Sequence, residues 1–371
     1  MCKKRDMMHM MDPTLPANDL PYLPPAVDVE SKATLKQAIV ANRELARLKE
    51  YCSRLPNEAI LLDTIVLKEA RASSEIENIV TTHDELYRAL VVRDDHIGPE
   101  TKEVLNYRSA MWKGVALLRE HSLITTRVIT QIQEELERNN AGIRTLPGTA
   151  LKNDLTGQTV YTPPDNEKTI RDLLANLEEY MNGESETDPL VKMAILHYQF
   201  ESIHPFYDGN GRTGRMLNVL YLMKEGLLDT PILYLSRHII KHKPTYYDLL
   251  QRVRTEGAWE QWIRFMLTAV EKTARLTLDT AKRIVAALEE TTERAHRELP
   301  RSTYSKELIE AVFVQPYVKI DHLVRAGIAE RRTASKYLKQ LEELGVLESY
   351  KAWRETVYLN TRLMDIIRES E

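Results

Sequence analysis

Helical periodicity is the feature of this sequence that most restricts its fold. Apolar residues recur three and four positions apart through most of the 371 residues, and only 13 glycines and 16 prolines interrupt the pattern. We therefore expect a mainly α-helical protein with few strands. Prolines cluster before Val27, so the chain is expected to begin with an extended arm. Helices are then expected over residues 31–48, 57–79 and 82–92.

A central helical block is expected from about residue 100 to residue 267, with one interruption. Residues 149–164 contain two short extended runs on either side of Thr156-Gly157, followed by two prolines that a helix would not tolerate. We expect a small β-hairpin here. Its second run contains Thr159, Val160 and Tyr161.

The last part of the chain is expected to form a separate module. A long helix over residues 259–299 is closed by Pro300 and leads into it. Three short helices and two strand-like runs are expected there, which is the pattern of a winged helix. The helices cover 304–314, 320–326 and 333–344, and the runs cover 346–350 and 356–359. The expected domains are an N-terminal arm and helical layer (1–99), a helical core (100–267), a linking helix (268–300) and the winged helix (301–371).

Charge and cysteine content exclude several classes of protein. Lys and Arg number 51 and Asp and Glu number 55, so the net charge of −4 does not favour nucleic acid or an anionic membrane as a partner. Cys2 and Cys52 are too few for a disulfide framework or a four-sulfur zinc site, which favours a reducing compartment. No apolar run has the length of a signal peptide or a membrane span. We expect a cytoplasmic protein without membrane contact.

Residues 204–215, His-Pro-Phe-Tyr-Asp-Gly-Asn-Gly-Arg-Thr-Gly-Arg, are the most informative stretch for function. They lie between two helical patterns, so they form a loop that leads into a helix N-terminus. Two glycines flank Asn210 and permit a tight turn in which successive N–H groups point to one side. The dipole of the following helix also favours an anion there. Arg212 and Arg215 are three residues apart, so they share a helix face and can grip phosphate oxygens.

A carboxylate and a histidine complete this stretch. Asp208 is a hard oxygen ligand that suits Mg²⁺ bridging two phosphates. His204 can be neutral near pH 7 and accept a proton from a hydroxyl that attacks beside those phosphates. Each feature alone has an ordinary structural explanation, but their combination within 12 residues is far rarer by chance.

This stretch resembles the signature His-x-Phe-x-Asp/Glu-Gly-Asn-Gly-Arg-x-x-Arg of Fic domain proteins and matches it at every specified position. The resemblance implies a Fic-type helical core with the hairpin as its flap, and a protein adenylyltransferase that uses ATP and Mg²⁺ to place AMP on a protein hydroxyl. It implies that His204 is the general base, Asp208 the Mg²⁺ ligand and Arg215 the γ-phosphate ligand, while Phe206 anchors the loop. The other ATP-binding positions that it implies are Gly209, Asn210, Gly211, Arg212, Thr213 and Gly214.

A second motif lies upstream. Ser73 to Asn78 is similar to the inhibitory helix motif of this family, Ser/Thr-x-x-x-Glu-Gly/Asn, with Ser73 first and Glu77 as the glutamate. The two residues are four apart and share a helical face, and a carboxylate that enters the phosphate site would occupy an arginine. Alone, the motif would be read as a solvated helix face. Beside a complete Fic loop, it implies autoinhibition by Glu77 within the same chain.

Two further elements resemble parts of the family's site. The hairpin around Thr159, Val160 and Tyr161 is similar to the Fic flap, which holds the target segment by main-chain pairing, although an ordinary surface hairpin is the alternative. Tyr246-Tyr247 resembles the aromatic pair beside the adenine pocket, with a place in the core as the alternative. Some relatives have an asparagine where this chain has Arg254, so a contact of Arg254 with the nucleotide is left open.

The resulting hypothesis is adenylylation of Ser, Thr or Tyr hydroxyls on target proteins and on the protein itself. Removal of AMP at the same site, with Glu77 orienting a water, is one alternative. DNA binding through the winged helix is another, because four basic residues lie on or near the candidate recognition helix. The nearly equal numbers of acidic and basic residues in 301–371 argue against nucleic acid and favour a role in docking or in a homodimer. The four basic residues are Arg331, Arg332, Lys336 and Lys339.

Overall fold

The structure, a computed structural model, describes residues 12–369 except 56, 92–96, 154–155 and 353–354. Cys2, Val92 at the end of one expected helix, and Asp154 and Leu155 of the expected hairpin therefore lie outside the described residues. The prediction of a mainly helical fold with small antiparallel sheets is confirmed.

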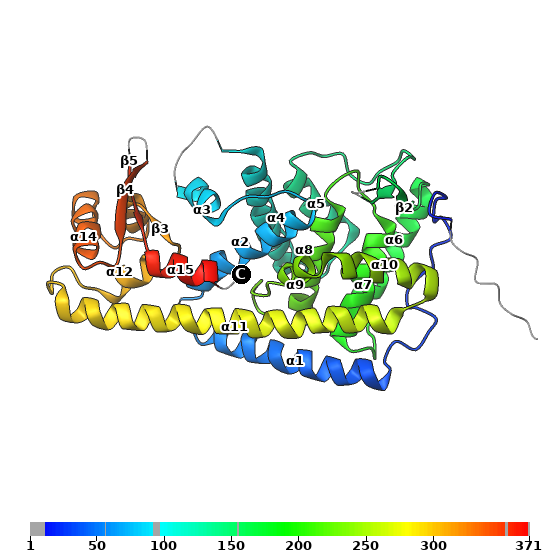
Figure 1. Ribbon diagram of the computed structural model, residues 1–371, viewed down its shortest axis with the longest axis horizontal. Helices are drawn as coiled ribbons and strands as arrows, with labels where there is room; N and C mark the ends of the chain where they lie inside the picture. Colours follow the sequence, from blue (N-terminus) through cyan, green and yellow to red (C-terminus); the bar gives the residue numbers. More distant parts are fainter. Residues whose placement is uncertain (1–11, 56, 92–96, 154–155, 353–354, 370–371) are drawn as a thin grey trace, which may run out of the picture.

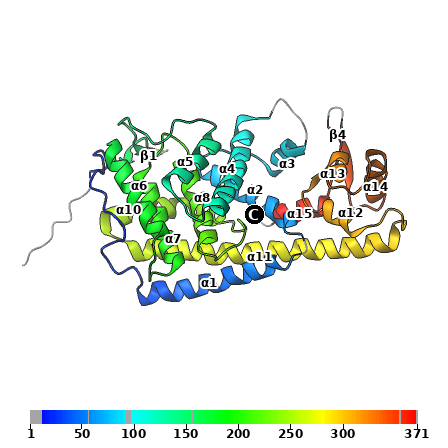
Figure 2. The ribbon, with the colours of Figure 1, turned by 180° about the vertical axis from the view of Figure 1, so that it is seen from behind.

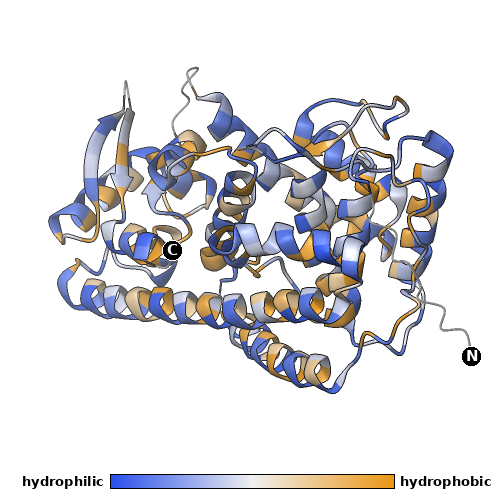
Figure 3. Cartoon of the chain, turned by 45° about the vertical axis from the view of Figure 1, so that its right-hand side comes forward, coloured by the Kyte–Doolittle hydropathy of each residue, from blue (hydrophilic) through white to orange (hydrophobic). Residues whose placement is uncertain are grey.

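The longest element is α11 (Trp259–Glu298), which runs along the molecule (Figures 1 and 2). Helix α1 (Lys32–Ser53) packs against α11 from below in these views, and most of the other helices lie above α11. Hydrophobic and hydrophilic residues alternate along α11 (Figure 3), as expected for a helix with one buried face. In the described part of the chain, no helix is long and apolar enough to cross a membrane.

The N-terminal arm and helical layer precede the core. The arm packs on the molecule: the Ala17 N–H donates to the carbonyl of Thr162, 3.0 Å away. Helix α1 begins after Ser31, whose hydroxyl caps the N–H of Thr34. Helix α2 (Ala59–Ile76) is buried along most of its length between other helices, and α3 (His83–Val91) follows it.

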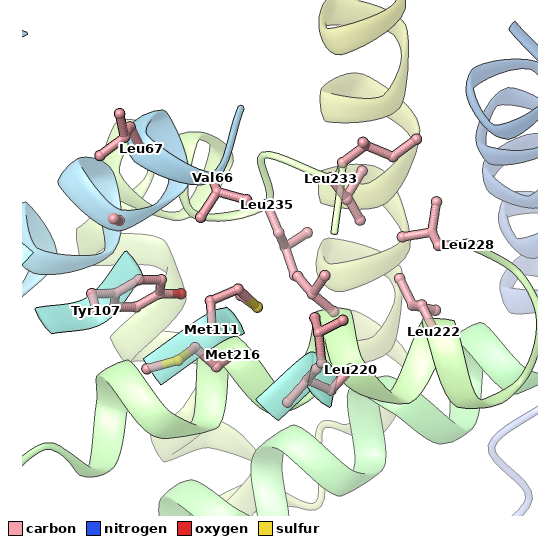
Figure 4. Packing of buried hydrophobic residues seen from close by; sticks show 14 of the residues in the cluster. Val66, Leu67, Tyr107, Met111, Met216, Leu220, Leu222, Leu228, Leu233 and Leu235 are labelled. Carbon is pink, nitrogen blue, oxygen red and sulfur yellow. The ribbon is translucent and has the colours of Figure 1, made fainter. Parts of the chain in front are cut away.

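The central block contains seven helices in the described residues. Two of them, α7 (Pro189–Ile203) and α8 (Asn210–Lys224), are buried on almost all sides. One continuous apolar cluster joins it to α2, and Figure 4 shows Leu67 of α2, Met111 and Met216 within this cluster. The predicted hairpin is present, with β1 (Leu151–Lys152) antiparallel to β2 (Thr159–Tyr161). The seven helices are α4 (Pro99–His121), α5 (Thr126–Glu137), α6 (Glu167–Asn182), α7 (Pro189–Ile203), α8 (Asn210–Lys224), α9 (Ser236–Lys241) and α10 (Lys243–Glu256).

The C-terminal module contains the three helices and two strands that the sequence predicts. It also contains two further elements, the strand β3 and the helix α15. Strand β3 joins the edge of the sheet, whose order is β3-β5-β4; two residues are too short for a visible alternation of apolar and polar residues. The final helix packs its apolar face on α11. The elements are α12 (Lys306–Ala311), β3 (Tyr317–Val318), α13 (Ile320–Arg325), α14 (Arg331–Glu343), β4 (Glu348–Ala352), β5 (Glu355–Leu359) and α15 (Thr361–Glu369).

Candidate active site

The motif loop connects the C-terminus of α7 to the N-terminus of α8. His204 caps α7 in the left-handed conformation (φ 49°, ψ 59°), and Gly209 starts α8 with φ 76°. The Asn210 side chain closes the loop, because its Oδ1 accepts from the N–H of Phe206 and its Nδ2 donates to the carbonyl of Phe206, both at 2.8 Å. Phe206 is 1% exposed. Asn210 and Phe206 therefore hold the loop shape.

Helix α8 begins three residues earlier than the sequence pattern indicates. This start decides which backbone N–H groups are left without an acceptor within the helix. Its first intrahelical hydrogen bond runs from the Thr213 N–H to the Gly209 carbonyl at 2.9 Å. The N–H groups of residues 210–212 lie in the first turn, where a helix supplies no acceptor of its own. Such groups, together with the helix dipole, make an anion-binding site.

Arg215 lies in the second turn of α8 and is 1% exposed. Its Nε donates to the Ser73 hydroxyl at 2.8 Å, and its Nη2 donates to the Ser73 carbonyl at 2.9 Å and to Glu77 Oε1 at 2.8 Å. The Glu77–Arg215 pair that the upstream motif predicts is therefore present. Burial alone would lower the pKa of Arg215, but the Glu77 carboxylate, together with smaller contributions from other acidic groups nearby, outweighs burial and raises the pKa.

Glu77 caps the C-terminus of α2 and reaches the first turn of α8. A Cβ added to Gly211 would lie 2.4 Å from Glu77 Oε1, so only glycine leaves room for the carboxylate there. Burial by itself would raise the pKa of Glu77, but the charge and hydrogen bond of Arg215, together with smaller contributions from nearby cationic groups, more than offset burial and lower the pKa below its ordinary value of 4.5. Glu77 is thus ionised at neutral pH and lies beside the anion-binding turn.

Arg212 is 3% exposed and is bonded by two carboxylates that the sequence analysis did not find. Its Nη1 donates to Glu103 Oε2 at 2.8 Å, and its Nη2 donates to Glu137 Oε1 at 2.9 Å. The two glutamates come from α4 and α5, so no local spacing connects them with the motif. Gly209 has φ 76°, which favours glycine, and a Cβ there would lie 2.3 Å from Glu137 Oε1 and displace this carboxylate.

His204 is electrostatically suited to accept a proton. Burial, with a smaller contribution from the nearby Arg144 charge, lowers its pKa to about 4, so the imidazole is neutral at pH 7. Its Nδ1 is buried and has no hydrogen-bond partner among the described residues. One turn earlier, Glu201 is also buried, and burial raises its pKa to about 7.

Asp208 is an exposed residue of the loop, with 78% of its side chain accessible. Its Oδ1 accepts the N–H of Gly209 at 2.7 Å. No cluster of three or more metal-ligating side chains exists among the described residues. Because Mg²⁺ commonly takes one carboxylate together with substrate phosphates and water, Asp208 fits a Mg²⁺ ion that arrives with a nucleotide.

The flap residues differ in exposure. Val160 is 40% exposed, whereas Tyr161 is 1% exposed and donates its hydroxyl to the Ser202 carbonyl at 2.8 Å. The guanidinium of Arg254 lies 3.8 Å from the centre of the Tyr161 ring and donates to the Ser202 hydroxyl at 3.2 Å. Arg254 therefore supports the base of the flap, and Thr159 at the start of β2 is half-buried.

The structure separates the two tyrosines of α10. Tyr246 is 1% exposed, its hydroxyl lies 2.8 Å from His197 Nε2, and its ring packs 5.6 Å from that of Trp262. Tyr247 is 44% exposed. Tyr246 is thus a core residue, and of the pair only Tyr247 presents an exposed ring.

The two motif positions between Arg212 and Arg215 are interior residues of α8. Thr213 is fully buried, and a Cβ on Gly214 would lie 2.5 Å from Glu201 Oε1. Gly214 therefore allows α7 and α8 to approach each other.

Three family models match the chain: "Fic/DOC family N-terminal" over residues 35–116, "Fic/DOC family" over 123–222, and "Protein adenylyltransferase SoFic-like, C-terminal domain" over 287–363. The chain belongs to the Fic/DOC family. The Fic/DOC match contains the whole motif loop, and the N-terminal match contains both Ser73 and Glu77.

Curated relatives of this Fic/DOC chain are similar over part of their length. Protein adenylyltransferase Fic from Aedes aegypti is 29% identical over 182 residues, which are 48% of this chain and 34% of that protein. The protein of the same name from Culex quinquefasciatus is 38% identical over 108 residues, 29% of this chain and 20% of that protein. The chain thus spans about a third or less of the length of these relatives.

Solved structures show the same fold. A Fic family protein from Desulfovibrio desulfuricans G20 superposes with a TM-score of 0.60 at 21% identity, over 91% of this chain and 98% of that one. Fic-1 (residues 134–508) from C. elegans superposes with a TM-score of 0.52 at 23% identity, over 67% of this chain and 74% of that one.

Proposed function

We propose that this protein is a protein adenylyltransferase that moves AMP from ATP to Ser, Thr or Tyr hydroxyls of target proteins and of itself. The observation that carries this proposal is a motif loop in which a neutral His204 and the anion-binding N-terminus of α8 are only a few residues apart. The names of the similar curated proteins agree with this activity.

In the proposed reaction, the target hydroxyl oxygen attacks the α-phosphorus of ATP. The new O–P bond forms while the bond from the α-phosphorus to the bridging oxygen breaks, and pyrophosphate leaves. The hydroxyl proton goes to the imidazole of His204, whose low pKa keeps it unprotonated beforehand. The hydrogen bonds of Asn210 to Phe206 hold the loop while this happens.

The nucleotide phosphates would be held by the N–H groups of residues 210–212 and by Arg215. Arg212 contributes its charge beside that turn, anchored by Glu103 and Glu137. Asp208 would hold Mg²⁺, which supplies charge neutralisation of the phosphates when it is bound. Tyr247 is the residue of the tyrosine pair that can contact the base, because its ring is exposed.

We further propose that Glu77 restrains the activity. Its ionised carboxylate and the Ser73 hydroxyl occupy the Arg215 guanidinium. A γ-phosphate without this arginine would bind in a pose that misaligns the α-phosphorus with the hydroxyl. A displacement of about 1 Å can lower a rate by roughly 10²-fold. Removal of AMP is the second candidate, because an ionised Glu77 beside the phosphate site could orient a water.

The C-terminal module has contacts that fit a docking role. Lys68 of α2 is buried and donates to the Ile367 carbonyl of α15 at 3.0 Å, and Tyr317 donates to Asp84 of α3. In α14, Arg331 is paired with Asp321. We therefore propose that this module supports the N-terminal layer or a homodimer. We also propose that the protein works in the cytoplasm on protein targets.

The test is AMP transfer from ATP labelled on the α-phosphate, with cell lysate and with the protein alone. Glu77→Gly should label itself and its targets, peptides should gain the mass of AMP, and label on the γ-phosphate should not be transferred. Glu77→Gly combined with His204→Ala should return to background. Absence of α-label from every protein with folded Glu77→Gly would refute the proposed activity. Loss of AMP from pre-labelled targets with wild type, abolished in Glu77→Gly, would support AMP removal instead.

A further inference from the structure

Arg144 is a buried cation outside the motif loop. It lies between α5 and β1, and it is 0% exposed. Its Nε donates to the His204 carbonyl at 2.7 Å, and its Nη2 donates to the Ile203 carbonyl at 3.2 Å and to the Pro164 carbonyl. Pro164 follows strand β2 of the flap. One guanidinium thus joins the residue proposed as the base to the end of the flap.

The backbone around Arg144 reinforces this junction. The Arg144 N–H donates to the Pro205 carbonyl at 2.9 Å, and Ile143 forms an isolated antiparallel bridge with Phe206. The N–H of Thr145 donates to the Tyr207 hydroxyl at 3.0 Å. Three successive residues, 143–145, therefore pair with three successive residues of the motif loop, 205–207. We call residues 143–145 the bracing segment.

The bracing segment acts on a residue whose backbone is strained. His204 has φ 49° and is not glycine, so it needs surrounding contacts to keep its left-handed conformation. Its carbonyl is bonded by Arg144, and the carbonyls on either side of it, from Ile203 and Pro205, are bonded by the Arg144 side chain and backbone. Loss of this side chain would leave buried carbonyls without donors and relax the loop.

We propose that Arg144 is a positioning residue that fixes His204 relative to the flap, and so aligns the base with the target hydroxyl that the flap presents. This inference rests on the proposed transfer to a protein hydroxyl. Arg144 touches neither the nucleotide nor the reacting atoms in this assignment; it acts through the His204 backbone.

A second consequence of Arg144 is electrostatic. Burial is the main cause of the low pKa of His204, the Arg144 charge lowers it further, Glu77 at the end of α2 raises it, and Arg254 on α10 lowers it. The Glu201 carbonyl on α7 also raises it. Removal of the Arg144 charge should therefore raise the pKa of His204, and Arg144→Lys, which keeps the charge, separates this effect from a loss of packing.

The experiment uses the full chain with three substitutions. Arg144→Met removes the charge and the donors, and Arg144→Lys keeps the charge but cannot reach all three carbonyls. Arg294→Met is the matched control, because it removes an exposed arginine of α11 that pairs with Glu298. Each is combined with Glu77→Gly for kinetics, and is studied alone, without nucleotide, for histidine titration by NMR. The His204 signal is assigned by its absence in His204→Ala.

We expect Arg144→Met to lower the rate of self-adenylylation at saturating ATP by roughly 10²-fold, with little change in the half-saturating ATP concentration. Arg144→Lys should recover part of the rate. The pKa of His204 should rise in Arg144→Met and stay near the wild-type value in Arg144→Lys and Arg294→Met. The control should match the parent in rate.

Two results would overturn the proposal: an unchanged rate in folded Arg144→Met, or an unchanged His204 titration in that variant. If Arg144→Met does not fold, Arg144→Lys decides, and a full parental rate for it would refute positioning by the three carbonyl contacts. The titration needs no ATP. A shifted pKa in a protein that transfers no AMP would therefore contradict the proposed function and leave the link between Arg144 and His204 standing.

Discussion

Substitution of Glu77 by glycine should make this protein less stable and more active at the same time. In the structure, Glu77 supplies one of the three hydrogen bonds of the Arg215 guanidinium, and Ser73 supplies the other two. A hydrogen bond to a charged group contributes about 1.5–3 kcal/mol. The Glu77 side chain is 37% exposed, so water can replace part of this hydrogen bond when Glu77 is removed. We therefore expect the free energy of unfolding to fall by about 1–2 kcal/mol.

A loss of this size should lower the melting temperature by roughly 2–5 °C. The expected effect on AMP transfer has the opposite sign, because Arg215 becomes free for a phosphate. ATP with Mg²⁺ should then recover the lost stability, since a ligand at about 100 times its Kd contributes about 2.7 kcal/mol. Thermal unfolding with and without ATP and Mg²⁺, beside a transfer assay with α-labelled ATP, measures both effects.

Glu75→Gly is the matched control. Glu75 lies in the last turn of α2, its side chain is 38% exposed, and its carboxylate is 3.9 Å from Arg71. It should show a comparable small loss of stability without a rise in transfer. Equal transfer by wild type, Glu75→Gly and Glu77→Gly across a range of ATP concentrations would refute the restraint by Glu77.

The pH dependence of the Glu77 effect has a definite sign. Arg215 lowers the pKa of Glu77 in the folded protein, so its stabilising contribution is present above its ordinary value of 4.5 and is lost as the pH falls through the folded value. The difference in stability between wild type and Glu77→Gly should therefore be full at pH 7 and shrink in acid. A difference that grows in acid would contradict the ion pair.

Further substitutions test the remaining assignments. His204→Ala should lower transfer by roughly 10²–10⁴-fold while calorimetry still detects ATP binding. Since the pKa of His204 is about 4, the wild-type rate should not fall by half near pH 6.5, and such a fall would contradict the low pKa. Asp208→Asn should raise the Mg²⁺ concentration for half-maximal transfer and leave the melting temperature unchanged, because the side chain is exposed. Tyr247→Ala should raise the half-saturating ATP concentration, whereas Tyr246→Ala should cost about 3–5 kcal/mol of stability in urea unfolding, and a Tyr246→Ala protein as stable as wild type would contradict its core position. Burial raises the pKa of Glu69 to about 7, so this group stabilises the fold below about pH 4.5 and loses that contribution as the pH rises through 7. Glu69→Gln should therefore gain stability relative to wild type between about pH 5 and pH 7.5, and parallel curves would refute this.

Much of the fold could be predicted because its signals are local. The period of the apolar residues located α1, α2 and α11 to within a few residues at most of their ends. Thr156-Gly157 marked the hairpin. The edge strand β3 and the helix α15 were missed, because the strand has two residues and the helix is defined by its packing on α11.

The candidate site divides in the same way. Residues 204–215 and the Ser73–Glu77 motif were found because their spacing along the chain carries the chemistry. Glu103, Glu137 and Arg144 were missed, since each reaches the loop from another element and has no fixed spacing to it. Tyr246 and Tyr247 could not be separated, because neighbours in sequence on a helix point in different directions and only packing decides which is buried.

The sequence by itself determined the helices, the loop between α7 and α8 and the chemical groups on it, because backbone propensity and short-range spacing act within one element. Tertiary structure decided the ionisation state and the charge partners of those groups. Burial keeps His204 neutral, α2 brings Glu77 to Arg215, and α4 and α5 bring two carboxylates to Arg212. The physical reason is that desolvation and charge interaction depend on distance in space, which the fold sets by packing segments that are far apart along the chain.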